Sequence, residues 1–324
     1  MSDTAERTGA PGASGTWAVV VNWNGGGAQN LACLRSLVGQ GVEAGRIIFV
    51  DNASTDGSRQ EVAAALPGLV HVDNDTNRGF GEAANQGATL ALESGAEAVF
   101  FVNNDLRFED GEPCLAGLEE TLESEPRIGM VGPRILFDDG TSRVWCAGGR
   151  LDYRQNLSTL LGHKQPDGPR WQESRPVDYI PGCALLAGRE CLLDVGLFDA
   201  SYFAYMEDVD LGLRARERQW SVRLRGDLRA LHAPSSSTGG GYGARRKWMQ
   251  GVNSVRFLKA HGRVLPWARF LVFDVLTLPL ALLLRGCRGE AGGVLAKAKG
   301  ILDGLAGRKV TAKALEPGSS RLWR

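Results

Sequence analysis

Acidic and amide side chains follow two short apolar runs of this sequence. One run is followed by Asp51 and Asn52, and the other by Asn104 and Asp105. Continuous apolar runs of this kind are typical of parallel strands buried on both faces, and ligands bind outside the carboxyl ends of such strands. A carboxylate there can accept a hydrogen bond from a nucleoside or hold a divalent metal against a diphosphate. The pairing therefore predicts a nucleotide-dependent enzyme.

Strands and helices alternate over the first hundred residues. We expect strands at 17–22, 46–50, 70–72 and 99–102, and helices at about 30–39 and 82–93, with another helix after Asp56. This alternation predicts a mostly parallel α/β sheet with helices on both faces. Residues 130–195 contain shorter β-like pieces, glycines and prolines, so we expect a mixed-sheet insertion that builds the acceptor side. Further helices are expected from Glu207 and from Arg245.

The composition is that of an ordinary globular protein. The 324 residues are 43% hydrophobic and 23% charged, and the formal net charge is zero. Such a balance argues against a nucleic-acid partner. The six cysteines form no CxxC pair, which argues against a zinc site and fits a reducing cytoplasm. Residues 1–15 are small and polar, as in a disordered leader.

Residues 263–324 form the last predicted unit, a C-terminal helical extension. Residues 264–284 are strongly apolar but are interrupted by Pro266, Arg269, Asp274 and Pro279. A membrane span needs about 20 apolar residues in succession. We therefore expect a hairpin that lies on a membrane surface or packs in the core.

The segment 285–324 is basic, with nine basic and three acidic residues. We expect one face of a helix to carry Leu295, Ile301, Leu302 and Leu305 beside these basic residues. Such a helix can lie on anionic lipid, but a packed terminal helix with a solvated basic face explains the pattern equally well. The predicted location is the cytoplasm, with a peripheral position on the inner face of the plasma membrane as an open alternative.

Five motifs occur in an order that resembles a known family. They are Val21-Asn22-Trp23-Asn24-Gly25, the run from Val50 to Ser58, Asn77-Arg78-Gly79-Phe80, Asn103-Asn104-Asp105 and the run from Phe203 to Asp210. Together they look like the motifs of family 2 inverting glycosyltransferases with the Rossmann-like GT-A fold, in the bacterial rhamnosyltransferase-like branch. The resemblance implies a transferase domain at 16–262, with a nucleotide-sugar-binding half at 16–130 and an acceptor-binding half at 131–262.

The resemblance also implies roles for individual residues. Asp208 would be the catalytic base of a single displacement, and Mn²⁺ or Mg²⁺ would be held by Asp105 and His232. The first position of the acidic motif is Asn103, which leaves Asp105 as its only anionic ligand. The implied donor-binding residues are Asn22, Asn24, Asp51, Asn52, Ser54, Asn77, Arg78, Gly79, Asn85, Asn104 and Asp105. The implied acceptor-binding residues are Gly182, Cys183, Glu207 and Asp208.

Simpler roles compete with these. Asp51 and residues 77–79 can cap turns or helices, and Asn103-Asn104-Asp105 is a turn-prone sequence. Glu207 and Asp208 also suit the acidic first turn of a helix. A lone histidine such as His232 is more often structural than a ligand.

Several functions remain open. The resemblance implies a dTDP- or UDP-sugar donor, with dTDP-rhamnose favoured, and a saccharide or lipid-linked acceptor. A soluble secondary-metabolite acceptor is the alternative, and a homodimer is also open. A nucleotidyltransferase would need a basic residue in the first glycine-rich loop, but none follows the first strand until Arg35. A non-catalytic glycan-binding protein would have no need of Asp51, Asp105 and Asp208 together.

Overall fold

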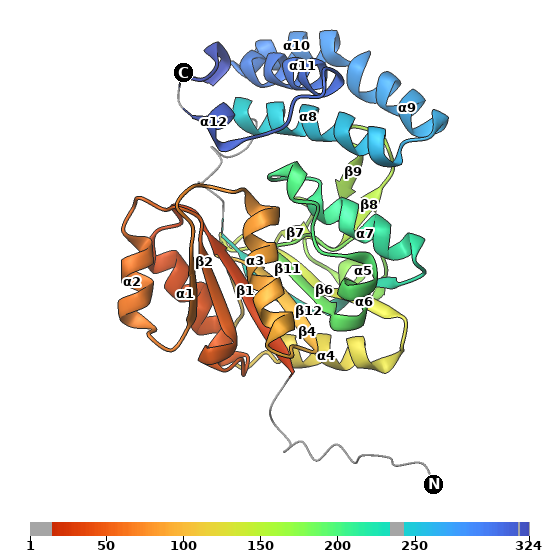
Figure 1. The fold of residues 1–324 in the computed structure, drawn as a ribbon. Helices are drawn as coiled ribbons and strands as arrows, with labels where there is room; N and C mark the ends of the chain where they lie inside the picture. Colours follow the sequence, from red (N-terminus) through yellow and green to blue (C-terminus); the bar gives the residue numbers. More distant parts are fainter. Residues whose placement is uncertain (1–14, 234–242, 317, 324) are drawn as a thin grey trace.

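The computed structural model describes residues 15–233, 243–316 and 318–323. The predicted leader and the Ser/Gly-rich loop at 235–243 lie outside the described residues, except for Gly15 and Gly243. In the described chain an α/β domain carries a separate layer of helices at its C-terminal end (Figure 1).

Ten strands of the described chain form one central sheet, in the order β10-β12-β6-β11-β4-β1-β2-β3, with β5 paired to β12 and β7 to β6. β8 and β9 form a separate pair. The strand bounds are β1 (Thr16–Asn22), β2 (Ile47–Asp51), β3 (Val70–Asp73), β4 (Ala98–Asn103), β5 (Leu106–Arg107), β6 (Ile128–Phe137), β7 (Val144–Cys146), β8 (Gly149–Leu151), β9 (Ser158–Leu160), β10 (Arg175–Pro176), β11 (Ala184–Gly188) and β12 (Ser221–His232).

The helices of the described chain cover both faces of the sheet and form the C-terminal layer. Their bounds are α1 (Gly27–Gly39), α2 (Ser58–Ala65), α3 (Phe80–Glu93), α4 (Cys114–Ser124), α5 (Pro169–Gln172), α6 (Arg189–Val195), α7 (Glu207–Glu217), α8 (Ala244–His261), α9 (Val264–Phe270), α10 (Leu278–Gly286), α11 (Ala291–Leu305) and α12 (Ala312–Leu315).

The predicted parallel half of the sheet is confirmed. β3, β2, β1 and β4 pair in parallel, and adjacent side chains of each strand enter opposite cores because strand side chains alternate in direction. Val19 and Ile48 pack in the core that contains α3, whereas Val20 and Phe49 pack in the core that contains α1 and α2. The carboxyl ends of these strands therefore meet at one edge, which we call the carboxyl edge.

The predicted mixed-sheet insertion is also confirmed. β11 runs antiparallel between β4 and β6, and β6 pairs in parallel with β12. The predicted division at 130/131 falls inside β6, and both halves share one sheet. Because β11 is reversed, its beginning lies beside the end of β4, so the turn before β11 reaches the carboxyl edge.

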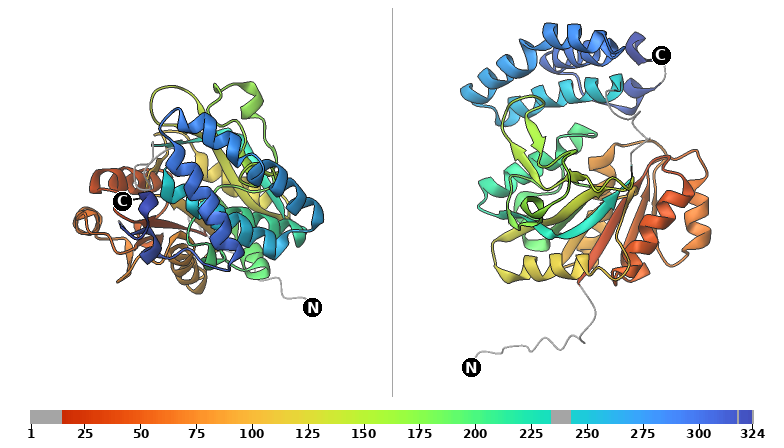
Figure 2. Two further views of the ribbon diagram at one scale, coloured as in Figure 1. Left: turned by 90° about the horizontal axis from the view of Figure 1, so that it is seen from above. Right: turned by 180° about the vertical axis from the view of Figure 1, so that it is seen from behind.

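The C-terminal helices stack above the carboxyl edge, with α8 nearest the sheet and α9, α10 and α11 outside it (Figure 2). α8 and α11 approach closely through glycines. A Cβ on Gly251 would meet the Lys297 carbonyl oxygen at 2.5 Å, and one on Gly304 would meet the Val252 carbonyl oxygen at 2.9 Å. α8 thus belongs to this helical layer as much as to the transferase domain that the sequence predicted at 16–262.

The predicted hairpin at 264–284 is wrong. Residues Val264–Gly286 form one helix of 23 residues, with a π-helical stretch at Leu271–Val275 between α9 and α10. By length and composition this helix is the one in the described chain that could cross a membrane, with a mean hydropathy of 1.8 and 11% of its apolar window buried. The two prolines lie in the first turns of α9 and α10, where a missing N–H costs little.

The predicted apolar face of α11 also needs correction. Leu295, Leu302 and Leu305 are exposed, but Ile301 is buried against α8 residues such as Val255. The helix therefore has two apolar faces, one packed and one open.

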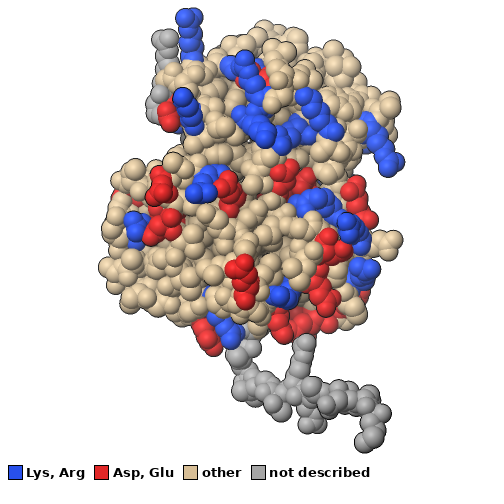
Figure 3. Space-filling model, viewed as in Figure 1, with Lys and Arg blue, Asp and Glu red and all other residues tan. Residues whose placement is uncertain are grey.

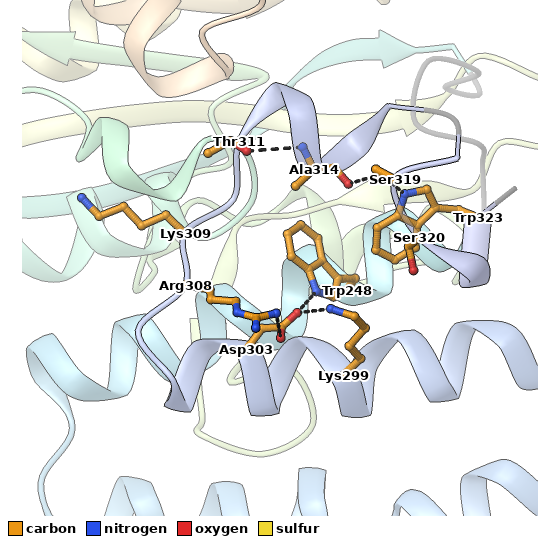
Figure 4. A pocket seen from close by; sticks show the side chains of 10 residues that line it. All are labelled: Trp248, Lys299, Asp303, Arg308, Lys309, Thr311, Ala314, Ser319, Ser320 and Trp323. Carbon is orange, nitrogen blue, oxygen red and sulfur yellow. Dashed lines mark hydrogen bonds and ion pairs between the residues drawn. The ribbon is translucent and has the colours of Figure 1, made fainter.

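The C-terminal segment folds back over α8 and α11 and closes a pocket there (Figure 4). Asp303 lies at its floor and accepts a hydrogen bond from Trp248 Nε1 at 2.8 Å. Lys299 and Arg308 also pair with Asp303. These contacts join α11 to α8, and the rings of Trp248 and Trp323, 5.5 Å apart, join the end of the described chain to α8.

Candidate active site

Asn22, at the end of β1, ties the carboxyl edge together. Its Nδ2 donates to Asp51 Oδ1 at 2.9 Å and to Ser54 Oγ at 3.0 Å. Its Oδ1 accepts from Asn104 Nδ2 at 2.9 Å and from Asn30 Nδ2 at 3.0 Å. The side chain is fully buried, so Asn22 aligns the ends of β1, β2 and β4 instead of presenting an open polar group.

Asp51 organises the turn after β2. Its Oδ2 accepts from the Ser54 backbone N–H at 2.9 Å, and its carboxylate is almost fully buried. Ser54 Oγ in turn accepts from the Asn24 N–H at 2.9 Å, and Asn24 Oδ1 accepts from the Thr55 N–H at 2.8 Å. The predicted donor residues of the first two strands thus form one connected network at the carboxyl edge.

Asn52 shapes residues 77–79, the second segment predicted to bind the donor. Its Nδ2 donates to Asn77 Oδ1 at 2.9 Å, and its Oδ1 accepts from the Arg78 N–H at 2.9 Å. Gly79 has a φ of 84°, and a Cβ there would lie 2.5 Å from the Phe203 carbonyl oxygen. Position 79 therefore requires glycine.

Two predicted donor residues have other contacts in the structure. Arg78 forms an ion pair with Glu82 at 2.9 Å on the exposed first turn of α3. Asn85 Nδ2 donates to the Phe198 carbonyl at 2.8 Å, and its Oδ1 accepts from the Phe198 N–H at 3.0 Å. Asn85 thus joins α3 to the segment before α7, a structural role that its position on the helix did not indicate.

Asp105 and His232 are brought together as the sequence predicted. Asp105 follows β4, His232 ends β12, and Nε2 of the histidine lies 3.3 Å from Asp105 Oδ1. Both side chains are buried, and Asp105 Oδ1 has no hydrogen-bond partner in the described chain. Burial raises the pKa of Asp105, while the nearby His232 acts in the opposite direction.

The tautomer of His232 decides what this pair can do. His232 Nδ1 lies 2.8 Å from the Ala233 carbonyl oxygen, which can only accept, so in the neutral ring Nδ1 carries the proton. Nε2 then presents a lone pair toward a carboxylate oxygen that also presents a lone pair. A cation between them would satisfy both, and the indole of Trp145, stacked at 4.4 Å, fixes the ring.

The carboxylate of Asp105 and the imidazole of His232 suit a hard divalent cation that takes its other ligands from oxygen atoms outside the protein. The described residues contain no group of three or more histidine, cysteine, aspartate or glutamate side chains that could hold a metal. A bound metal would therefore take Asp105 and His232 as its protein ligands and complete its coordination with phosphate and water oxygens.

Glu207 and Asp208 open α7 as expected. Asp208 accepts from the Gly182 N–H at 3.2 Å and from the Val209 N–H at 2.8 Å. Burial raises the pKa of Asp208, and burial together with the Asp208 charge raises the pKa of Glu207 well above its usual range. Glu207 Oε2 is buried and has no hydrogen-bond partner in the part of the chain that is described.

Burial disfavours the charged form of both carboxyl groups, and the Asp208 charge adds to this cost for Glu207. The pair therefore resists carrying two negative charges and favours holding one shared proton. An ionised Asp208 can accept a proton, and a protonated Glu207 can donate a hydrogen bond.

One turn connects the two acidic centres. The Cys183 carbonyl accepts from the Asn103 N–H at 2.9 Å, and the preceding Gly182 donates to Asp208. Charges on both Asp105 and Asp208 contribute to raising the pKa of the buried Cys183 thiol, although burial is the main cause. Gly182 and Cys183 therefore space the two carboxylates, and the thiol itself is a small packing group.

The segment before Asp208 is strained and firmly held. Phe203, Tyr205 and Met206 have φ values of 65°, 69° and 80°, which side chains other than glycine rarely adopt. The fully buried Asn253 of α8 donates from Nδ2 to the carbonyls of Tyr202, Ala204 and Tyr205 at 2.9, 2.8 and 2.9 Å. The sequence did not reveal this role, because Asn253 lies inside an unbroken helical pattern.

Asp210, the third acid of this helix, has a structural role. Its Oδ2 accepts from Arg214 Nε at 2.7 Å, and its Oδ1 lies 2.6 Å from His261 Nε2. Although burial acts to raise its pKa, these two partners hold the pKa of Asp210 below its usual value. Asp210 and Arg214 therefore form an ion pair one helical turn apart on α7.

Comparisons with known proteins agree with this geometry. The sequence profile described as glycosyl transferase family 2 matches residues 18–187. The N-acetylglucosaminyl-diphospho-decaprenol L-rhamnosyltransferase of Mycobacterium tuberculosis is 30% identical over an alignment of 212 residues that covers 60% of this chain and 68% of that protein. The low-salt glycan biosynthesis hexosyltransferase Agl10 of Haloferax volcanii is 23% identical over 190 residues, 57% of this chain and 58% of the relative.

Solved structures share the fold at low identity. The mannosyltransferase PcManGT of Pyrobaculum calidifontis, in complex with GDP-Man and Mn²⁺, has a TM-score of 0.56 and 17% identity, covering 90% of this chain and 87% of that one. GalNAc-T7 with UDP, GalNAc and Mn²⁺ has a TM-score of 0.57 and 16% identity, covering 75% and 47%. With the profile spanning half of its length, the chain belongs to the glycosyl transferase family 2 and has the GT-A fold.

Proposed function

We propose that the protein is an inverting glycosyltransferase that uses a pyrimidine nucleotide-diphosphate sugar. The donor class is dTDP- or UDP-sugar, with dTDP-rhamnose favoured by the similarity to the mycobacterial rhamnosyltransferase. The acceptor is a hydroxyl of a saccharide or of a lipid-linked saccharide, and the reaction takes place in the cytoplasm. The observation that carries the proposal is the arrangement of Asp105, His232 and Asp208 around one turn at the carboxyl edge.

The donor would lie over the ends of β1, β2 and β4. Its nucleoside meets the network built on Asp51, Asn52 and Asn77, and its diphosphate meets Asp105 and His232. A divalent cation held by these last two residues would neutralise the leaving diphosphate. Mn²⁺ or Mg²⁺ suits this oxygen-rich set.

Asp208 would act as the base of a single displacement. Its carboxylate takes the proton of the acceptor hydroxyl while that oxygen forms a bond to the anomeric carbon. The bond between that carbon and the diphosphate oxygen breaks, and the nucleoside diphosphate leaves with the electron pair. Glu207, in its protonated form, donates a hydrogen bond that orients the acceptor.

Nucleotide binding tests the donor half without any turnover. We would measure the melting temperature with UDP, dTDP, GDP and CDP, each with and without Mn²⁺, because a ligand of the native state raises it by mass action. We expect a Mn²⁺-dependent increase with one pyrimidine diphosphate that is lost in Asp105→Asn. Glu190→Gln, an exposed change on α6 at the opposite edge of the sheet, should keep the increase. If no nucleotide raises the melting temperature, the proposal is wrong.

Turnover tests the base. Asp208→Asn should retain the Mn²⁺-dependent increase in melting temperature but lose about 10²- to 10⁴-fold in kcat, the usual contribution of a general base. Full turnover by this variant would exclude Asp208 as the base.

A further inference from the structure

The helix Val264–Gly286 leaves a broad apolar face uncovered. Leu276 and Leu283 are 65% and 67% exposed, and Leu265 and Leu280 are exposed to a similar degree. The open face of α11, carrying Leu302 at 67% exposure, belongs to the same outer layer of helices. Soluble surfaces rarely expose apolar side chains in such a continuous group, so the face indicates a binding partner.

The charge of this layer indicates which partner. Residues 263–324 contain eleven basic and four acidic residues, which leaves 26 basic and 33 acidic residues in 1–262. Three of the four acids are already paired, Asp274 with Lys297, Glu290 with Arg285, and Asp303 with Lys299 and Arg308. The space-filling view shows lysine and arginine gathered on the helical layer and acidic side chains mainly on the domain below it (Figure 3).

The middle of the helix is anchored to the protein, which argues against its crossing a bilayer. Asp274 is buried and pairs with the buried Lys297 of α11, and it also accepts from the Asn156 N–H at 2.9 Å. In a membrane-crossing orientation the helix would lose these contacts and carry Asp274 and Arg269 into hydrocarbon. A helix that keeps them lies flat, with its leucines outward.

We propose that this face docks on an anionic phospholipid surface. The leucines enter the boundary between headgroups and acyl chains, and the basic residues of the same helical layer attract it to the negative headgroups. This inference goes beyond the proposed transfer reaction and requires neither the donor nor the base assignments. The sequence left two positions open for residues 264–284, on a membrane surface or packed in the core, and this inference selects the membrane surface.

Vesicle sedimentation with the full chain tests the proposal. We expect binding to phosphatidylcholine vesicles that contain phosphatidylglycerol, weaker binding to phosphatidylcholine alone, and release by high salt or alkaline carbonate. The double variant Leu276→Glu/Leu283→Glu should bind at least about tenfold more weakly, because it loses two apolar contacts and adds two charges that the surface repels. Both positions are exposed, so the fold should be retained.

The matched control is Leu193→Glu on α6, where Leu193 is 62% exposed but lies outside the helical layer. It should bind like the wild type. Three results would overturn the proposal: equal binding by the double variant, retention on the vesicles in alkaline carbonate, or a lipid-free dimer that the double variant dissociates while the wild type ignores anionic vesicles. The second result would mean a spanning helix, and the third a face that binds another copy of the chain.

Discussion

Replacing Asn253 should loosen the segment that precedes Asp208, the proposed base, because α8 would no longer hold the carbonyl groups of that segment. Its two N–H groups serve three carbonyls of the segment that precedes Asp208. Each hydrogen bond contributes about 0.5–1.5 kcal/mol net. Asn253→Ala should therefore reduce the free energy of unfolding by roughly 2–3 kcal/mol.

The catalytic effect should be larger than this loss suggests. A positive φ at Phe203, Tyr205 and Met206 costs on the order of 1 kcal/mol per residue, so the segment stores strain that Asn253 helps to hold. Once released, the segment can relax and displace the Asp208 carboxylate. A displacement of about 1 Å can cost roughly 10²-fold in rate. We expect kcat to fall by about that factor.

Urea unfolding and steady-state kinetics on three variants provide the assay. Asn253→Asp keeps the shape but replaces the donors with a carboxylate facing three carbonyls, so it should be at least as damaging as the alanine variant. Ser254→Ala is the matched control, because Ser254 is equally buried on α8 and its hydroxyl has no hydrogen-bond partner in the described chain. If Asn253→Ala loses stability but keeps its kcat, or if it behaves like Ser254→Ala, the coupling does not exist.

Three further predictions concern other buried contacts. Glu207→Gln mimics the protonated acid, so it should keep most activity and the position of the acid limb in a pH–rate profile. Because burial raises the folded-state pKa of Glu207, the wild type loses stability as the pH rises from the unfolded value of 4.5 toward the raised folded-state value, and this variant should melt higher than the wild type by a margin that grows over that window. Lys297→Met leaves Asp274 buried without its partner and should cost about 3–5 kcal/mol in urea unfolding, most of which the double variant Lys297→Met/Asp274→Leu should recover. Gly300→Ala would force α11 away from α8 and should cost about 1–3 kcal/mol; Gly292→Ala on the same helix meets no atom within 4 Å and should be neutral or slightly stabilising by thermal melting.

Local patterns predicted the donor half of the fold well. The apolar runs ending at Asp51 and Asn103 became central strands, and their carboxyl ends met as the rules for parallel sheets require. The pairing of Asp105 with His232 was also predicted, although it joins β4 to β12 across more than a hundred residues. The structure brings these two side chains close together, and the expectation came from motif resemblance, since neither strand pattern shows which segments become neighbours.

Tertiary contacts decided what local patterns could not. Asp274 looked like an interruption of an apolar segment, but Lys297 and Asn156 satisfy it, so the helix continues through it. Ile301 faces α8 because glycines on both helices allow close packing, and helical spacing alone does not reveal a partner of that kind. Trp145 and Asn253 were missed because their roles exist only where distant segments meet.

The antiparallel insertion of β11 also affects how this chain can fold during synthesis. β4 is complete at Asn103, but the strand that pairs with its free edge begins at Ala184. At ribosomal rates of about 5–20 residues per second, that edge waits roughly 4–16 seconds for its partner. The waiting strand, Ala98–Asn103, is almost wholly apolar, and an unpaired apolar strand is a template for aggregation. Slow translation of residues 104–183 should therefore lower the soluble yield of this protein more than slow translation after residue 188.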